Sequence, residues 1–252
     1  MILCAALPAL LLALALRAQE APPDALADLA AQGRWEDLLG ASAERLAQAP
    51  EDVAALYWSG RAHLERGRAL LAGSRFAQEL GRGLLHRAAE QLGAVGPAAF
   101  ADAPNWALFA RYLAGDEETL AADLEHAAGA GSGYAARLRG LLARDKGEPG
   151  ASDWLARAAA ALPQDPQVRI ELAAELAARG ERAGALAVLE EARALGADRA
   201  LWLATLLSAL SGPEHADELL ARLQLLLQEP GAERDARLAW YRSWALQEAG
   251  RL

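Results

Sequence analysis

Apolar residues recur at helical spacing in two short segments on either side of Gly180. Before this glycine the apolar positions are Ile170, Leu172 and Leu176, and after it they are Leu186, Leu189, Ala192 and Leu195. Residues three or four apart share one face of a helix, so residues 167–197 are predicted to form two amphipathic helices joined by a turn. Helices this short need neighbours to bury their apolar faces, so we expect a stack of similar pairs.

A small residue followed seven positions later by a glycine recurs along the chain. The pairs are Gly60 and Gly67, Gly140 and Gly147, Ala173 and Gly180, and Ser243 and Gly250. A small residue lets a neighbouring helix cross closely, and a glycine ends a helix in a conformation that other residues avoid. The pattern therefore predicts that Gly67, Gly147, Gly180 and Gly250 lie at helix ends.

This pattern resembles the tetratricopeptide repeat, which has a period of about 34 residues and the skeleton W-x2-L-G-x2-Y, A-x3-F, P. Phe76, four residues after Ala72, fits the aromatic position of that skeleton, and Pro50 and Pro163 fit its closing proline. Two positions depart from it: Leu56 replaces the tryptophan and His63 replaces the tyrosine. The resemblance implies an all-α, right-handed α–α superhelix over residues 21–252, with about six helix pairs and a C-terminal helix.

The expected helices cover most of the chain after residue 24, where Asp24 is a predicted N-cap. They span 24–32, 35–48, 51–66, 68–92, 105–114, 116–128, 134–146, 149–162, the two within 167–197, 199–210, 213–228 and 232–249. Gly33 and Gly115 are further predicted turns. The glycine- and proline-bearing segment 93–103 interrupts the array, either as an irregularity or as a functional insertion. The last helix is either an end cap or the first half of another repeat.

Composition supports helices and argues against nucleic acid as a partner. Of the residues, 54% are hydrophobic, with many Ala and Leu, which favours helix over strand. The formal net charge is −9, and such a surface discourages nonspecific binding to nucleic acid. Of the 25 basic residues, Lys146 is the single lysine.

The N-terminus has the pattern of a secretory signal peptide. Residues 2–16 are uncharged and largely apolar, and a polar segment with Arg17 follows them. A bilayer span needs about 20 apolar residues, so residues 1–20 are predicted to be a cleaved signal peptide of a periplasmic or secreted protein. Cys4 is the only cysteine, so the mature chain would contain no thiol. A lipid anchor on Cys4 is the alternative, although little hydrophobic sequence precedes it.

The resemblance also implies a function, namely non-catalytic binding of a peptide or partner protein in a concave groove lined by the first helices of successive pairs. Carried over by position relative to each turn glycine, the groove candidates are Tyr57, Arg61, Leu64, Asn105, Phe109, Tyr112, Arg137, Arg144, Trp240 and Trp244. Aromatic and arginine side chains are frequent interface anchors, although about half of these are expected to pack between repeats instead. A structural subunit of an envelope assembly is the alternative.

Arginines recur every seven residues at Arg61, Arg68, Arg75 and Arg82, and we call this series the arginine ladder. Arg68, Arg75 and Arg82 would share one face of the predicted helix 68–92, where they are candidates for binding an anion or acidic peptide. The alternative is a solvated face that balances acids elsewhere.

An enzyme is the least favoured interpretation. Asp123 with His126, and His215 with Glu218, have the i, i+3 spacing found in the di-metal sites of helical bundles. Their charged neighbours point to exposed positions, and no phosphate loop, G-x-S-x-G or HExxH motif is present. We therefore expect no cofactor and no metal.

The tryptophans are regularly spaced. Trp58, Trp106, Trp154 and Trp202 recur every 48 residues, but Trp154 falls in the second helix of its predicted pair and the others in first helices. We interpret the interval as coincidence.

Overall fold

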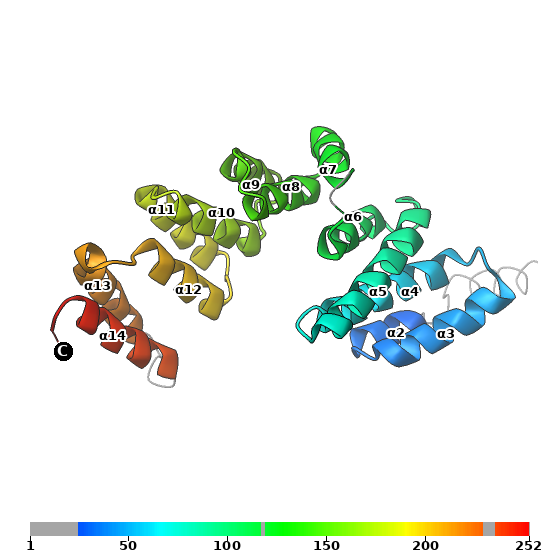
Figure 1. Ribbon diagram of the computed structural model, residues 1–252, viewed down its shortest axis with the longest axis horizontal. Coiled ribbons are helices and arrows are strands. Elements are labelled where there is room, and N and C mark those ends of the chain that lie inside the picture. Colours follow the sequence, from blue (N-terminus) through cyan, green and yellow to red (C-terminus); the bar gives the residue numbers. More distant parts are fainter. Residues whose placement is uncertain (1–24, 117–118, 229–234, 252) are drawn as a thin grey trace, which may run out of the picture. The chain divides into compact units, whose positions relative to one another are not determined.

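Helices are the only regular secondary structure in the part of the chain that the structure describes, residues 25–116, 119–228 and 235–251. The structure is a computed structural model (Figure 1). It confirms the predicted all-α class. The predicted signal peptide (1–20) and the predicted cap Asp24 lie outside the described residues. No helix among those described is both long and apolar enough to cross a membrane.

The helices form two compact units, residues 1–120 and 121–252. The described helices of the first unit are α2 (Ala25–Ala31), α3 (Trp35–Gln48), α4 (Val53–Leu70), α5 (Arg75–Ala94) and α6 (Ala103–Ala114). Each packs against the next in sequence, and α4 and α5 lie side by side over most of their length (Figure 1). One apolar cluster joins α2, α3 and α4 around Leu26 and Leu38, and a second joins α4, α5 and α6 around Leu64, Leu85 and Leu92.

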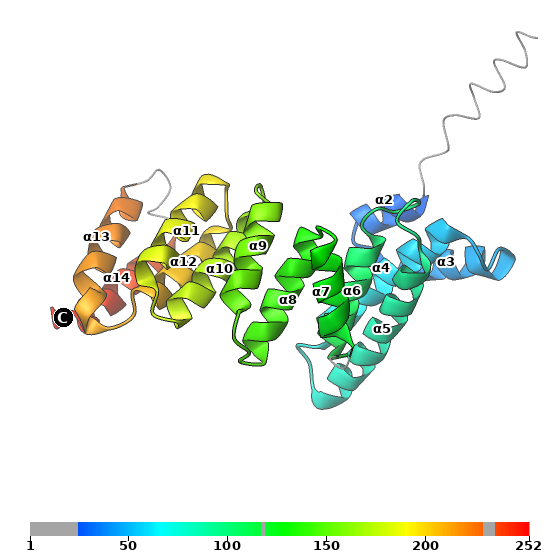
Figure 2. The ribbon, with the colours of Figure 1, turned by 90° about the horizontal axis from the view of Figure 1, so that it is seen from above.

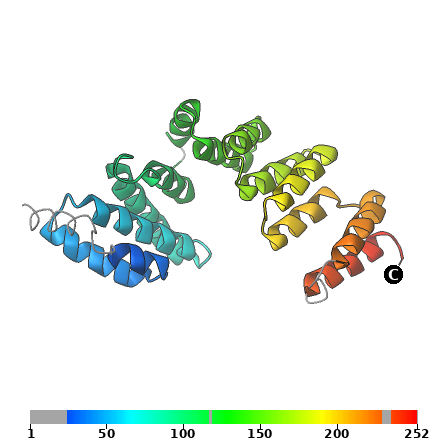
Figure 3. The same ribbon diagram turned by 180° about the vertical axis from the view of Figure 1, so that it is seen from behind.

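The second unit continues the pattern of paired helices. Its described elements are α7 (Leu120–Gly129), which starts at the boundary, α8 (Gly133–Asp145), α9 (Ala151–Ala161), α10 (Pro166–Ala178), α11 (Arg182–Ala194), α12 (Arg199–Ala209), the short 3₁₀ helix η1 (Pro213–His215), α13 (Ala216–Leu227) and α14 (Ala236–Glu248). Helix α8 packs on α9 and α10 on α11 (Figure 2), and α13 lies beside α14 (Figure 3). Leu189, Leu203, Leu223 and Leu238 belong to one core that extends from α10 to α14.

Three of the glycines with positive φ end alternate helices at a nearly constant interval. Gly115, Gly147 and Gly180 follow α6, α8 and α10, at intervals of 32 and 33 residues. Their φ values of 77°, 65° and 76° strain any residue with a Cβ, so glycine ends these helices at low cost. Gly131 and Gly196, with φ values of 97° and 80°, follow α7 and α11 in the same way. The turns predicted at Gly115, Gly147 and Gly180 are confirmed, and Gly250 likewise has a φ of 66°.

The turn predicted at Gly67 is wrong. Helix α4 continues through Gly67 to Leu70, and α5 begins at Arg75, so the predicted helix 68–92 is divided between two helices. Gly67 is instead a point of close approach, because a Cβ there would lie 2.8 Å from Cγ of Leu85 and 2.9 Å from the backbone oxygen of Gly81. The sequence alone does not distinguish a glycine that allows a neighbouring helix to approach closely from a glycine that forms a turn.

Phe76 does not occupy an aromatic position between helices. It lies in the first turn of α5 with 81% of its surface exposed, and Leu80, one turn later, is 52% exposed. Ala72 lies in the connection between α4 and α5 and not within a helix. The A-x3-F part of the repeat skeleton is therefore not met at these residues.

Candidate functional site

Arg61 and Trp106 bring α4 and α6 together on a partly exposed face of the first unit. The guanidinium carbon of Arg61 lies 3.8 Å from the centre of the Trp106 ring, within the range of a cation–π interaction. Glu65, one turn later on α4, lies 3.9 Å from Nη2 of Arg61, whose side chain is 17% exposed. Arg61 is thus fixed between a carboxylate and an indole.

Asp102 holds the start of α6 against α4. Its carboxylate accepts hydrogen bonds from the hydroxyl of Tyr57, at 3.1 and 2.9 Å, and from Nε1 of Trp106 at 2.8 Å. Burial, and then the hydrogen bond to Asp102, raise the pKa of Tyr57. The ring of Phe100 stacks on that of Tyr57, with centres 3.9 Å apart and planes at 6°. The segment 93–103, predicted to be an irregularity or an insertion, is therefore anchored to α4 at its C-terminal end.

Three aromatic residues spaced three apart form one face of α6, which we call the α6 aromatic face: Trp106, Phe109 and Tyr112. The ring centres of Trp106 and Phe109 are 6.2 Å apart, and those of Phe109 and Tyr112 are 6.4 Å apart with planes at 18°. All three side chains, and that of Asn105, are only partly buried. The face thus combines large apolar rings with access to solvent.

Two of the groove candidates on α4 are core residues. Tyr57 is 4% exposed and Leu64 is 0% exposed, so neither faces a partner directly and the prediction that they line a surface is corrected. Their packing partners on α5 and α6 determined this, and the helical spacing alone did not. Arg61, Asn105, Phe109 and Tyr112 remain at the surface. The sequence analysis did not include Trp106 among the groove candidates, although its spacing of three residues from Phe109 predicts that both side chains share one face of α6.

The remaining groove candidates lie in the second unit in two separate places. Arg137 on α8 donates hydrogen bonds of 2.7 and 2.6 Å to Glu171 on α10, and its side chain is 19% exposed. Arg144, at the end of α8, contacts its neighbour Asp145 at 3.3 Å. Trp240 on α14 is 63% exposed, and Trp244 packs partly against the core of this unit. The structure does not gather these residues into one surface.

The predicted arginine ladder is also corrected. Arg68 is in the last turn of α4, whereas Arg75 begins α5 and Arg82 lies within it, so the three do not share a helix. Arg68 lies 3.7 Å from Glu65, and Arg82 donates a 3.0 Å hydrogen bond to Glu79. No single anion site on one helix face arises from this spacing.

The histidines considered for a metal centre lie on different elements. His126 is exposed on α7, and His215 lies in η1, where its Nε2 is 3.2 Å from Glu214. Within the described residues, no three His, Cys, Asp or Glu side chains gather as metal ligands would.

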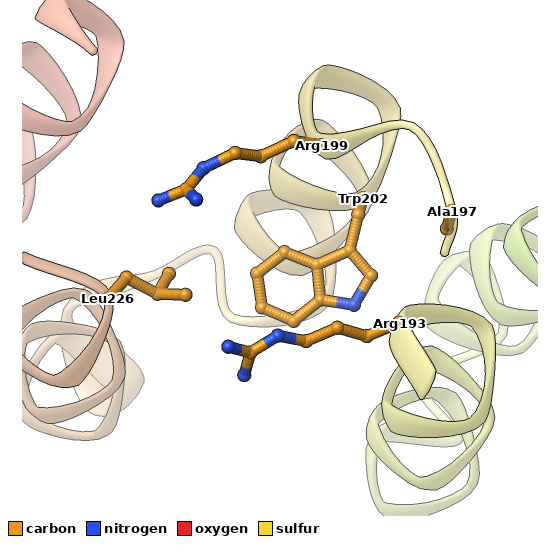
Figure 4. Close-up of a pocket in the computed structure, with 5 residues that line it drawn as sticks. All are labelled: Arg193, Ala197, Arg199, Trp202 and Leu226. Atoms are coloured by element: carbon orange, nitrogen blue, oxygen red, sulfur yellow. The ribbon is translucent and has the colours of Figure 1, made fainter. Parts of the chain in front are cut away.

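A pocket of about 170 Å³ lies between α11, α12 and α13 of the second unit (Figure 4). We call it the Trp202 pocket, and its lining residues are Arg193, Ala197, Arg199, Trp202 and Leu226. Figure 4 shows the indole of Trp202 between the two arginine side chains, whose guanidinium groups extend toward Leu226. Sequence reasoning did not single out this group, because its members come from three helices.

Comparison with known proteins adds no assignment to this geometry. The chain matches no protein-family model, no curated protein and no solved structure.

Proposed function

We propose that this chain is a tetratricopeptide-like repeat protein that binds a protein or peptide partner and has no catalytic role. In this proposal the helix pairs wind as a right-handed α–α superhelix. The intervals of 32 and 33 residues between helix-ending glycines support it, because they are close to the period of about 34 residues of that repeat. The pairing of α8 with α9 and of α10 with α11 supports it as well.

The α6 aromatic face, together with Arg61, is the observation that carries the binding function. Its three rings are contiguous and partly exposed, and contiguous apolar surface that solvent reaches is uncommon unless it serves an interaction, whereas single exposed apolar residues are ordinary. Tryptophan, tyrosine and arginine are enriched among the few residues that contribute most to binding at the centres of protein interfaces. Arg61 is already ordered by Glu65 and Trp106, so binding would cost little side-chain entropy.

Affinity capture with matched variants tests this function. The bait is the full chain, incubated with an extract of the organism that encodes it, and the bound proteins are quantified by mass spectrometry. Phe109→Ala and Tyr112→Ala are expected to lose a stoichiometric partner that the unaltered chain retains. Far-ultraviolet circular dichroism checks that both variants keep their helices.

Phe76→Ala is the control, because Phe76 is an exposed aromatic residue of the same unit that lies outside the α6 aromatic face. It is expected to retain the partner. Equal loss with Phe76→Ala, or full retention with Phe109→Ala and Tyr112→Ala, would exclude the α6 aromatic face as the binding surface.

Export is the second part of the proposal, and it rests on the apolar segment 2–16 followed by polar residues. Cell fractionation followed by N-terminal sequencing tests it. We expect the protein in the periplasmic or secreted fraction, with a mature N-terminus near residue 21. Full-length protein in the cytoplasmic fraction would contradict export without affecting the binding proposal.

A further inference from the structure

Helices α8, α10 and α14 have the same local construction. Each has 13 residues and follows a polar cap whose side chain accepts a hydrogen bond from a backbone N–H of the first turn. A glycine with positive φ lies 15 positions after each cap. The caps are Ser132, Asp165 and Asp235, and the glycines are Gly147, Gly180 and Gly250. Positions counted from the cap are therefore equivalent in the three helices.

In α8 and α10 the eighth position after the cap is covered by the second helix of the pair. Gly140 occupies it in α8, where an added Cβ would lie 2.7 Å from Cγ of Leu155 on α9. Ala173 occupies it in α10, where it is 0% exposed and shares a core with Ala185 of α11. A small residue at this position therefore lets a second helix cross closely.

The same face of α14 is left uncovered by the residues that the structure describes. Ser243 occupies the eighth position after the cap of α14 and is exposed. Trp240 is 63% exposed, whereas its counterpart on α10, Ile170, is 5% exposed. The exposed residues that share this side of the helix, which we call the open face of α14, are Ala236, Trp240, Ser243 and Gln247.

The opposite side of α14 holds the helix in the second unit. Leu238 and Ala245 are 0% exposed and belong to the core that extends from α10 to α14. The Trp240 ring meets that of Tyr241 edge-on, with centres 5.1 Å apart, and Tyr241 packs against the same core. Trp240 is thus held at the surface, and an exposed tryptophan is a residue type that anchors protein interfaces.

The open face is complementary to itself when two α14 helices run antiparallel. Trp240 and Ser243 have the same midpoint along the helix as Ala236 and Gln247. A second α14, related by a two-fold axis at this midpoint, therefore places its Ser243 opposite Trp240 and its Gln247 opposite Ala236. A large side chain meets a small one at each of these contacts, which allows the two helices to interdigitate.

Charge favours the same antiparallel direction. Arg237 and Glu248 lie near opposite ends of α14 and flank the open face on one side. The antiparallel pairing brings Arg237 of each copy near Glu248 of the other, whereas a parallel pairing would bring like charges together. Arg237 also lies 2.9 Å from Asp235 of its own chain, but a guanidinium has five N–H donors and can contact both acids.

We propose that the open face of α14 binds the open face of a second copy of this chain, as an antiparallel helix pair around a two-fold axis. The second α14 takes the place that α9 takes on α8 and that α11 takes on α10. The inference stands on the second unit alone, so it is independent of the α6 aromatic face.

Sedimentation velocity of the full chain over a range of concentrations tests this proposal, and a dimer that dissociates on dilution is expected. Ser243→Arg places a long charged side chain at the centre of the pairing, and Trp240→Ala removes its largest side chain. Each change is expected to weaken the dimer at least about tenfold. Ser208→Arg is the matched control, because Ser208 is an exposed serine on α12, outside the open face, and this variant is expected to dimerise as the unaltered chain does.

Charge reversal tests the direction of the pairing. Arg237→Glu and Glu248→Arg are each expected to weaken the dimer about tenfold, because each brings like charges together at both symmetric contacts. The double variant restores opposite charges and is expected to recover the dimer to within about threefold of the unaltered chain. Far-ultraviolet circular dichroism and the thermal midpoint verify that each variant is folded.

Three outcomes would overturn the proposal. The first is a chain that stays monomeric at every concentration, which would leave the open face to a helix of a different protein. The second is a dimer that Ser243→Arg weakens no more than Ser208→Arg does. The third is a double variant, Arg237→Glu with Glu248→Arg, that dimerises no better than either single variant.

Discussion

Arg137 on α8 and Glu171 on α10 form a bidentate ion pair, with N–O distances of 2.7 and 2.6 Å. The residues are 34 positions apart, and they join the first helix of the α8–α9 pair to the first helix of the α10–α11 pair. Both side chains are largely buried, at 19% and 12% exposure. Burial lowers and the carboxylate of Glu171 raises the pKa of Arg137, and the net shift is upward. This ion pair links the two helix pairs, which also pack through α9 and α10.

Breaking this pair from one side is expected to destabilise the second unit. Arg137→Ala leaves a largely buried carboxylate without its charged partner, which costs about 1–3 kcal/mol. Glu171→Ala leaves the guanidinium instead and is expected to cost a similar amount. Urea unfolding of the two single variants and the double variant measures the coupling, and we expect the double variant to lose less than the sum of the singles. Simple additivity would show that the pair contributes no specific interaction.

Gly67 and Gly83 test the difference between a close helix contact and an open helix position. Gly67→Ala places a methyl group 2.9 Å from the backbone oxygen of Gly81, which cannot rotate away, so a loss of about 1–3 kcal/mol is expected. Gly83 lies within α5, where an added Cβ meets nothing within 4 Å, so Gly83→Ala should stabilise by up to about 1 kcal/mol. Thermal unfolding distinguishes them, and stabilisation by both changes would refute the close contact.

His63 makes the stability of the first unit depend on pH. Its Nδ1 is 2.9 Å from Oε1 of Gln91, and burial is the main cause that lowers its pKa from 6.5, with Arg87 and Arg66 contributing. Because the folded pKa is below the unfolded pKa, the unfolded chain binds the proton first. The contribution of neutral His63 to the free energy of unfolding is therefore fully present above about pH 6.5, and it is lost as the pH falls through the folded pKa.

Urea unfolding at several pH values measures this effect. His63→Gln is expected to reduce the loss of stability below pH 6.5, and His86→Gln, an exposed histidine on α5, to leave it unchanged. An unaltered pH dependence in His63→Gln would assign the effect to other groups.

Tyr57 is expected to affect stability at high pH. Its pKa is raised from 10.0, first by burial and then by Asp102, so the folded state disfavours its ionisation. The stabilisation is fully present below pH 10 and decreases as the pH rises through the raised pKa. Tyr57→Phe removes a hydrogen bond to Asp102 worth about 1–2 kcal/mol at neutral pH and should flatten this decrease. Unfolding measurements with Tyr241→Phe, a change in the other unit, provide the comparison.

The helices themselves were largely predictable, because their signals are local. Apolar spacing around Gly180 was sufficient for α10 and α11, and the turn at Gly180 was correct because a positive φ is a property of one residue. The same reasoning failed at Gly67. Whether a glycine ends a helix or admits a neighbour depends there on Leu85 and Gly81, which belong to another helix.

The candidate sites depended more on tertiary structure. Helical spacing placed Tyr57 and Arg61 one turn apart on α4, but only the position of Asp102 and Trp106 buried the first and kept the second at the surface.

The sequence by itself determined an all-helical chain with recurring glycine turns and an aromatic, arginine-containing stretch, because spacing and backbone preference act over a few residues. The Trp202 pocket was decided by tertiary structure alone. Its arginines, indole and leucine come from α11, α12 and α13, and its burial and volume arise only when these helices pack.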